Sequence, residues 1–251
     1  MEVLAIALTV TAGVLMGAIN NVAGGAGVLG LLAFEYAFDM PLETANPSTR
    51  LAAIAIGTFA CLGFLRAGRR IPRTAIAQAL VAAPGALLGA QLAVGLPDLV
   101  FRSYLAVIML LLLRQQLRPT PPDTTPSPTW LRVLGCFFIG LHMGYAQVGT
   151  GLVATLVLAH AYERDLLAVN TAKSIVVIVT SITAATSLGV AGAISWTPAI
   201  ALAVGAGVGS YLASHWSVKK GADAIRRVVL VIAICTLLEQ LRQIALLLTA
   251  D

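Results

Sequence analysis

The sequence predicts an all-α integral membrane protein, because it is strongly apolar, sparsely charged and divided into segments of helix length. Of its 251 residues, 59% are hydrophobic and only 11% are charged, whereas a soluble domain carries about 25% charged residues. Several segments with few charges are about 20 residues long, enough to cross a hydrocarbon core of about 30 Å as helices. They show no alternation of polar and apolar residues, so transmembrane strands are not expected.

The first half, residues 1–117, is expected to form one membrane repeat of about four apolar segments. No basic stretch of the signal-peptide type precedes its first segment, residues 3–19, so we expect this segment to remain in the mature protein. Residues 28–38 are too short to span the membrane alone and predict a half-helix. Pro47 is expected in the first turn of the next helix, and Pro84 predicts a kink. The remaining segments of this half are residues 46–65, 75–94 and 104–113.

A linker rich in proline and threonine, residues 118–129, separates this half from a second membrane repeat, residues 130–251. The second repeat has the same order of long and short apolar segments. These segments are residues 131–143, 152–161, 166–190, 198–215 and 225–248. The agreement between the halves predicts a duplicated unit, as in many transporters. A constant offset places Gly17 on Gly140, Ala45 on Ala168, Ser48 on Thr171 and Arg50 on Lys173.

Each repeat opens with a polar, glycine-rich break in its first apolar segment. The breaks are residues 20–27 and residues 144–151. Each glycine costs roughly 1 kcal/mol relative to alanine within a helix, so we expect the helix to end there. At membrane depth a broken helix is tolerated only where it is buried in protein or lines an aqueous cavity. Two geometries are open for each break, a re-entrant hairpin or two short crossings.

The basic residues predict that the two repeats are inverted relative to each other. They form one cluster in each half: Arg66, Arg69, Arg70 and Arg73 in the first, and Lys219, Lys220, Arg226 and Arg227 in the second. Basic loops prefer the cytoplasm. Both clusters lie on that side only if an even number of crossings separates them, which a re-entrant hairpin or two short crossings at each break provides; a single crossing at each break would place the second cluster outside. The net charge of +5 therefore indicates membrane orientation and not binding to nucleic acid.

Arg50 and Lys173 are the residues that most clearly indicate a binding site. Each lies a few residues inside an apolar segment, where a cation costs at least about 2.5–3.5 kcal/mol and normally faces a cavity. The alternative is that each side chain snorkels to the interface. Small polar residues precede both cations: Asn46 and Ser48 in the first half, and Asn170 and Thr171 in the second. If the nearest carboxylates, Glu43 and Asp165, stay in water, the cavity is positive and suits an anion.

The breaks can supply further hydrogen-bond donors to the same anion. A helix that starts after Gly27 or Gly151 points free backbone N–H groups and its positive dipole end into the cavity. The candidate substrate-binding residues are Asn20, Asn21, Gly24, Gly25, Gly27, Asn46, Ser48, Arg50, Gln147, Gly149, Thr150, Gly151, Asn170, Thr171 and Lys173. His142 and Glu35 are candidates for proton coupling. A hydrogen-bonded packing histidine and an interfacial glutamate are the alternatives for these two residues.

The sequence gives no support for catalysis, a cofactor or a metal site. The three cysteines, Cys61, Cys136 and Cys235, are isolated within apolar segments, without a Cys-x-x-Cys spacing or a histidine cluster. There are no paired carboxylates and no nucleophile–base pair that the sequence can support. A Walker-type phosphate-binding loop is also absent, so this chain is not expected to hydrolyse ATP. We therefore predict a protein that is not an enzyme.

The two glycine-rich segments, each followed by an alanine-rich helix with a small polar motif, resemble the sulfite exporter TauE/SafE family of sulfonate and sulfite transporters. The matching residues are 17–27 with 45–48 and 140–151 with 168–171, and the pattern extends over nearly the whole chain. The family's triple glycine reads Gly24-Gly25-Ala26-Gly27 here, and the proline that usually follows it is absent. The resemblance implies a multi-pass bacterial inner-membrane protein that transports sulfite, thiosulfate or organosulfonates.

We therefore predict a secondary transporter, an exporter by this resemblance, that moves a small anion by alternating access. Its expected partners are the anionic substrate and the lipid bilayer. An anion channel of the same fold and a membrane accessory subunit are the alternatives. The sequence leaves open whether the protein is a monomer or a homodimer.

Overall fold

The computed structural model describes residues 2–23, 26–95, 97–117, 128–159, 162, 166–217 and 222–249. Within these residues the regular elements are all α-helices. The first half forms α1 (Glu2–Ala23), α2 (Gly27–Phe38), α3 (Leu42–Ser48), α4 (Arg50–Arg66), α5 (Arg73–Ala93) and α6 (Asp98–Leu117). The second half forms α7 (Thr129–Tyr145), α8 (Thr150–Ala159), α9 (Leu166–Val190), α10 (Trp196–Ser217) and α11 (Ala222–Thr249).

Five helical stretches in the described part of the chain are long and apolar enough to cross a membrane. They are Glu2–Asn20, Leu42–Arg66, Arg73–Ala93, Ala168–Val190 and Trp196–Ser214. The second of these comprises α3 and α4 together. The all-α membrane class that the composition predicts is thereby confirmed.

The first apolar segment of each half is broken, as the glycines predict. α1 ends at Ala23 and α2 begins at Gly27, whereas α7 ends at Tyr145 and α8 begins at Thr150. α2 has 12 residues and α8 has 10, which is about half of the length that a membrane span needs. Both are therefore half-helices.

The helix that contains Pro47 starts earlier than the sequence predicts. It begins at Leu42, so Pro47 lies inside α3 and not in its first turn. A proline inside a helix removes one backbone hydrogen bond and crowds the preceding turn. The helix accordingly ends at Ser48, and α4 starts after Thr49, whose hydroxyl donates to the Asn46 carbonyl oxygen at 2.6 Å.

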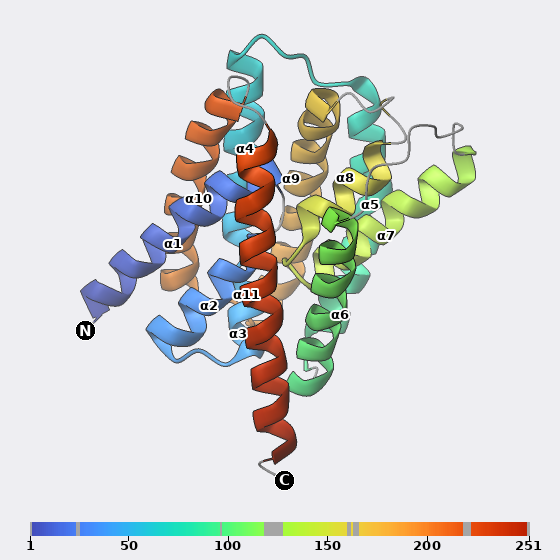
Figure 1. Cartoon of the computed structure of the whole chain (residues 1–251). Coiled ribbons are helices and arrows are strands. Elements are labelled where there is room, and N and C mark those ends of the chain that lie inside the picture. The colour runs from blue at the N-terminus through green and yellow to red at the C-terminus, as the bar shows by residue number, and fades with distance from the viewer. Residues whose placement is uncertain are drawn as a thin grey trace.

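Corresponding helices of the two halves run in opposite directions (Figure 1). In this view α4 rises while α9 descends, α5 descends while α10 rises, and α6 rises while α11 descends. α2 leads from its break toward the bottom of the view, and α8 leads from its break toward the top.

The helix packing is reciprocal between the halves. α1 packs on α10 as α7 packs on α5, and α4 packs on α10 as α9 packs on α5. α4 also packs on α9, and α6 packs on α11. Each half therefore packs on the other, and the largest buried cluster surrounds α2 and the second break.

Glycines allow the backbones of two of these pairs to come close, as small residues often do in membrane proteins. A Cβ atom at Gly17 would overlap the Ala206 carbonyl oxygen in α10, and one at Gly144 would overlap the Ala86 carbonyl oxygen in α5. Gly17 thus corresponds to Gly144 in this packing, one turn beyond the Gly140 that a constant offset assigns to it. α1 continues from Gly17 to Ala23, whereas α7 ends directly after Gly144.

The basic loops lie at one end of the helices. Residues 67–72 join α4 to α5 at the top of Figure 1, and α10 ends and α11 begins at the same end. Arg226 and Arg227 fall in the first turns of α11, whereas Lys219 and Lys220 lie outside the described residues. The acidic loop at Asp39 and the C-terminus lie at the opposite end.

Candidate functional site

The two breaks meet at the centre of the protein. A Cβ atom at Gly27, the first residue of α2, would overlap the Gln147 carbonyl oxygen and lie 3.2 Å from the Val148 Cα atom. Ala26 and Val148 are both fully buried and belong to the same hydrophobic cluster. Only glycine fits at position 27, so the start of α2 rests directly on the backbone of the second break.

The backbone of the second break is turned sharply before α8 begins. Ala146 is extended, with φ −137° and ψ 137°, and Gly149 adopts a φ of 73°, a conformation that favours glycine. Thr150, which is 1% exposed, then starts α8. The first backbone N–H groups of a helix have no intrahelical acceptors, so the start of α8 can donate hydrogen bonds to an anion.

Arg50 is completely buried and closes the C-terminal end of α7. Its Nη2 atom donates to the carbonyl oxygens of Gly144 at 2.9 Å and Tyr145 at 3.2 Å. Further bonds run from Nη1 to Gln147 Oε1 at 3.2 Å and from Nη2 to Asn46 Oδ1 at 3.3 Å. The last carbonyls of a helix lack partners and carry its negative dipole end, so a guanidinium stabilises them. Only the Nε atom of this guanidinium has no partner.

Lys173 is also buried, at 5% exposure. Its Nζ atom donates to Asn170 Oδ1 at 2.8 Å, within the same helix. The arrangement matches that of Arg50, which bonds to the amide oxygen of Asn46 one turn earlier. Neither cation snorkels to the surface.

The two cations lie on opposite sides of the crossing between α4 and α9. A Cβ atom at Gly57 of α4 would lie 3.0 Å from the Ser174 carbonyl oxygen and 3.2 Å from the Ile178 nitrogen in α9. Since the two helices are antiparallel (Figure 1), Arg50 lies below this contact in that view and Lys173 lies above it. At 1.5 Å per residue they are about 15 Å apart along the helix axes. The two candidate cations therefore lie at different levels of the protein.

No carboxylate neutralises either cation in the part of the chain that the structure describes. The ion pairs found there involve Arg102 and Arg242, and the partners of Arg50 and Lys173 are amide and carbonyl oxygens. Among the described residues the centre thus carries an excess of positive charge, and buried charges of this kind normally require a partner. A small anion can provide one.

His142 fixes the second break from within α7. Its Nε2 atom lies 3.0 Å from the Val148 carbonyl oxygen, and its Nδ1 atom is bonded to the Tyr104 hydroxyl of α6. A neutral imidazole protonated on Nε2 satisfies both contacts, with the tyrosine hydroxyl as donor to Nδ1. The Tyr104 ring packs edge-on against the Tyr145 ring, 4.6 Å between centroids. α6 thereby covers the break.

Glu35 does not lie at the interface on its own, because it pairs with Arg102 of α6. Arg102 Nη2 donates to Glu35 Oε1 at 2.6 Å, and the arginine is 6% exposed. The sequence analysis did not identify Arg102. It lies just before an apolar segment, and its partner is 67 residues away in the chain, so no local pattern reveals the pair.

The remaining candidate residues differ in what the structure shows of them. Asn20 lies inside α1, one turn before the break, and is 7% exposed, with no partner for its Oδ1 atom. The Ser48 hydroxyl accepts from the Ser195 backbone N–H at 2.9 Å, which directs it toward the loop between α9 and α10. Thr171 and Gly151 are buried in α9 and α8. Asn21 also belongs to α1, but the structure does not describe its side chain. Gly24 and Gly25 lie outside the described residues.

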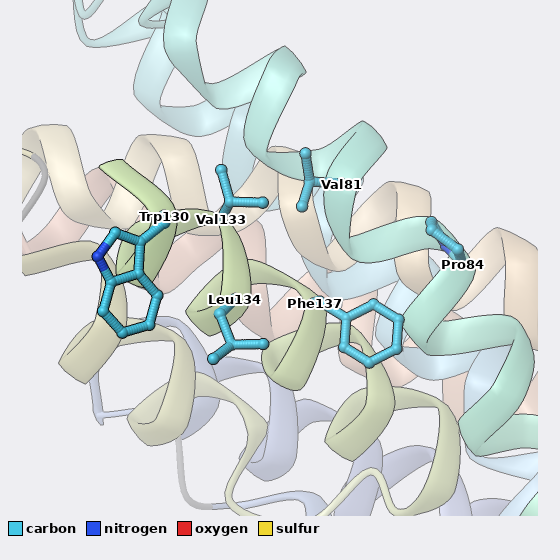
Figure 2. A pocket seen from close by; sticks show the side chains of 6 residues that line it. All are labelled: Val81, Pro84, Trp130, Val133, Leu134 and Phe137. Carbon is cyan, nitrogen blue, oxygen red and sulfur yellow. The ribbon is translucent and has the colours of Figure 1, made fainter. Parts of the chain in front are cut away.

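A separate hollow on the surface has no polar lining and does not suit an anion. It has a volume of about 620 Å³ and lies between α5 and α7 (Figure 2). Its lining residues are Val81, Pro84, Trp130, Val133, Leu134 and Phe137. Among the described residues, no cluster of His, Cys, Asp and Glu could hold a metal ion.

The protein has several membrane-length helices, two helices that are broken by glycines, and buried cations without a carboxylate partner among the described residues. These features define a multi-pass membrane protein with the architecture of a transporter. A family model described as Sulfite exporter TauE/SafE matches residues 9–239. The chain belongs to this family of membrane sulfite exporters, in agreement with the resemblance of its glycine-rich segments. Neither a search of curated proteins nor a search of solved structures gives a match.

Proposed function

We propose that this protein is a secondary transporter that exports a small sulfur oxyanion, such as sulfite, by alternating access. The observation that carries the proposal is the pair of buried cations, Arg50 and Lys173, beside two broken helices and without a carboxylate partner in the described residues. The family assignment supports a sulfur oxyanion as the substrate.

The anion would bind where the half-helices meet. Arg50 has a buried Nε atom without a partner, which can donate to an oxyanion. The N-terminal N–H groups of α2 lie at the first break, and those of α8, with the Thr150 hydroxyl, lie at the second; they are further donors. Oxyanions are favoured at such sites because each oxygen accepts several hydrogen bonds from fixed donors.

The placement of the cations on opposite sides of the helix crossing supports alternating access. An anion that enters from the end with the basic loop meets Lys173 first, and an anion at the opposite end meets Arg50 first. The opposite directions of corresponding helices support an inverted-repeat arrangement, in which one repeat rocks against the other around a fixed site. The interleaved packing of the halves supplies the surfaces that would slide.

The energy for export would come from ion gradients and not from ATP, since the sequence has no nucleotide-binding loop. With a negative cytoplasm, expulsion of one negative charge is favoured by about 2.3 kcal/mol per 100 mV. His142 and Glu35 are the candidates for a coupled proton, and both lie on contacts that α6 makes with the broken segments. The basic loop at the cytoplasmic face of an inner membrane fits this direction.

The proposal is tested by reconstitution of the purified protein into liposomes with radiolabelled sulfite. A transporter gives flux that saturates with concentration and counterflow when unlabelled sulfite is placed on the far side. Flux that rises linearly without counterflow would indicate a channel instead. Absence of flux would indicate an accessory subunit, and a chemically altered product would indicate an enzyme.

A further inference from the structure

Arg102 has binding capacity that its contacts in the protein do not use. It is 6% exposed, and only its Nη2 atom is engaged, with Glu35 Oε1 at 2.6 Å and Asp98 Oδ2 at 3.7 Å. The Nε and Nη1 atoms are buried and have no partner. A guanidinium presents its donors as a planar fork that fits two oxygens of one anion. Because the bond to Glu35 uses Nη2, the Nε and Nη1 donors of the guanidinium remain available.

Polar side chains of α2 and α11 lie near the same turn of α2 as the Glu35–Arg102 pair, and we call them, with Arg102, the polar layer. Next to Glu35, the Tyr36 hydroxyl donates to Glu239 Oε1 of α11 at 2.7 Å. Gln240, the following residue, is 2% exposed, and its Oε1 atom has no partner. Neighbouring residues of α2 thus bond Arg102 of α6 and the residue before Gln240 in α11, and α6 also packs on α11. Unused donors and an unused acceptor in this layer fit a small oxyanion that carries a proton.

This polar layer is separate from the place where the two breaks meet. Glu35 follows Gly27 by eight residues of α2, which is about 12 Å along the helix. The layer therefore lies toward the end where α2 ends and α6 begins, opposite the basic loop (Figure 1). α6 connects the two places, since the Phe101 ring packs against the Tyr145 ring at 5.6 Å between centroids, and the Tyr145 carbonyl oxygen accepts from Arg50.

We propose that Arg102 forms a second anion site, in which a small oxyanion displaces the Glu35 carboxylate from the guanidinium. This inference rests on the proposed transport function and identifies where the anion pauses between the centre and the end opposite the basic loop. The anion must displace the Glu35 carboxylate, because the charged side chains of the layer already include more carboxylates than arginines. These side chains are two arginines, Arg102 and Arg242, and three carboxylates, Asp98, Glu35 and Glu239. With Glu35 in place, an added anion would be repelled.

Three substitutions in the full-length protein separate this site from a structural ion pair. Glu35→Gln removes the competing charge and keeps the shape, so sulfite binding at the second site should become roughly tenfold tighter. Arg102→Lys keeps the ion pair with Glu35 but lacks the planar fork, so the second site should be lost. Tyr36→Phe is the matched control, since it breaks the bond to α11 and leaves the arginine unchanged.

The measurement is calorimetric titration of sulfite into each variant in lipid nanodiscs, with melting temperatures to establish folding. For the wild type we expect two sulfite sites. The substitutions above should change the affinity of the second site, at Arg102, and leave the other site unchanged. Identical isotherms for wild type, Glu35→Gln and Arg102→Lys would overturn the second site and leave the transport proposal standing. An absence of sulfite binding in the wild type would overturn both.

Discussion

Replacement of Arg50 should destabilise the protein, because its guanidinium holds the end of α7 against α4. Arg50→Gln removes a 2.9 Å bond to the Gly144 carbonyl oxygen and four longer contacts, at 3.2 to 3.4 Å, to Tyr145, Gln147, Asn46 and Thr49. The 2.9 Å bond to a charged group contributes about 1.5–3 kcal/mol and each longer, weaker contact about 0.5 kcal/mol, so the whole set contributes about 3.5–5 kcal/mol. Loss of the buried charge offsets part of this by removing its desolvation cost. The net loss of stability should be about 2–4 kcal/mol.

Arg50→Lys should be at least as damaging as Arg50→Gln. Lysine keeps the cost of burying a cation but cannot bond both carbonyls with a rigid planar group. Arg66→Gln is the matched control, because Arg66 lies on the same helix, is exposed and, among the described residues, bonds the Tyr211 hydroxyl at 2.8 Å. Its loss should cost less than about 1 kcal/mol.

Thermal unfolding of the purified variants measures these differences. A loss of 1 kcal/mol lowers the melting temperature by about 2–4 °C in a protein of this size, so Arg50→Gln should melt about 4–16 °C below wild type. If Arg50→Lys melts at the wild-type temperature, the charge alone suffices and the role given to the planar group is wrong. If both variants match Arg66→Gln, the buried network contributes nothing to stability.

Three further predictions test the fold around the site. Gly27→Val should abolish stable protein, since a side chain there would overlap the backbone of the second break. Gly189→Ala is the control and should be tolerated, because the nearest atom to its Cβ would be 3.7 Å away. Protein yields and melting temperatures measure both effects. Tyr104→Phe removes the hydroxyl that bonds the α7 histidine and should speed hydrogen exchange at the break by about five- to tenfold, corresponding to about 1 kcal/mol. Cysteine labels at positions 69 and 219 should react from the same membrane face, and labelling from opposite faces would contradict the predicted orientation.

The sequence reveals those parts of the fold that have a local cause. Clustered glycines end α1 and α7 where polar residues follow an apolar segment, and the lengths of residues 28–38 and 152–161 predict half-helices. Arg50 and Lys173 are recognisable because a cation within an apolar segment is costly. Their burial could be expected from the same cost.

Features that depend on contacts between distant segments could not be predicted in this way. Arg102 resembles an ordinary interfacial cation until Glu35 is seen beside it. The roughly 15 Å between Arg50 and Lys173 follows from the antiparallel crossing of α4 and α9, which a one-dimensional alignment of the halves does not contain. The early start of α3 likewise reflects packing of Leu42 in the core, which overrides the preference of proline for a first turn.

The central claim, that buried cations without carboxylate partners hold the anion, is tested most directly by the dissociation constant of sulfite for Lys173→Met. Lys173 has one described bond within its own helix, so its removal should leave the melting temperature nearly unchanged. Affinity for an anion that enters from the end with the basic loop, where Lys173 lies, should fall roughly 10- to 100-fold, the equivalent of one or two charge-assisted hydrogen bonds. Arg132→Gln, at an exposed cation, should bind as wild type does. Equal affinity of Lys173→Met, Arg132→Gln and wild type would contradict the account.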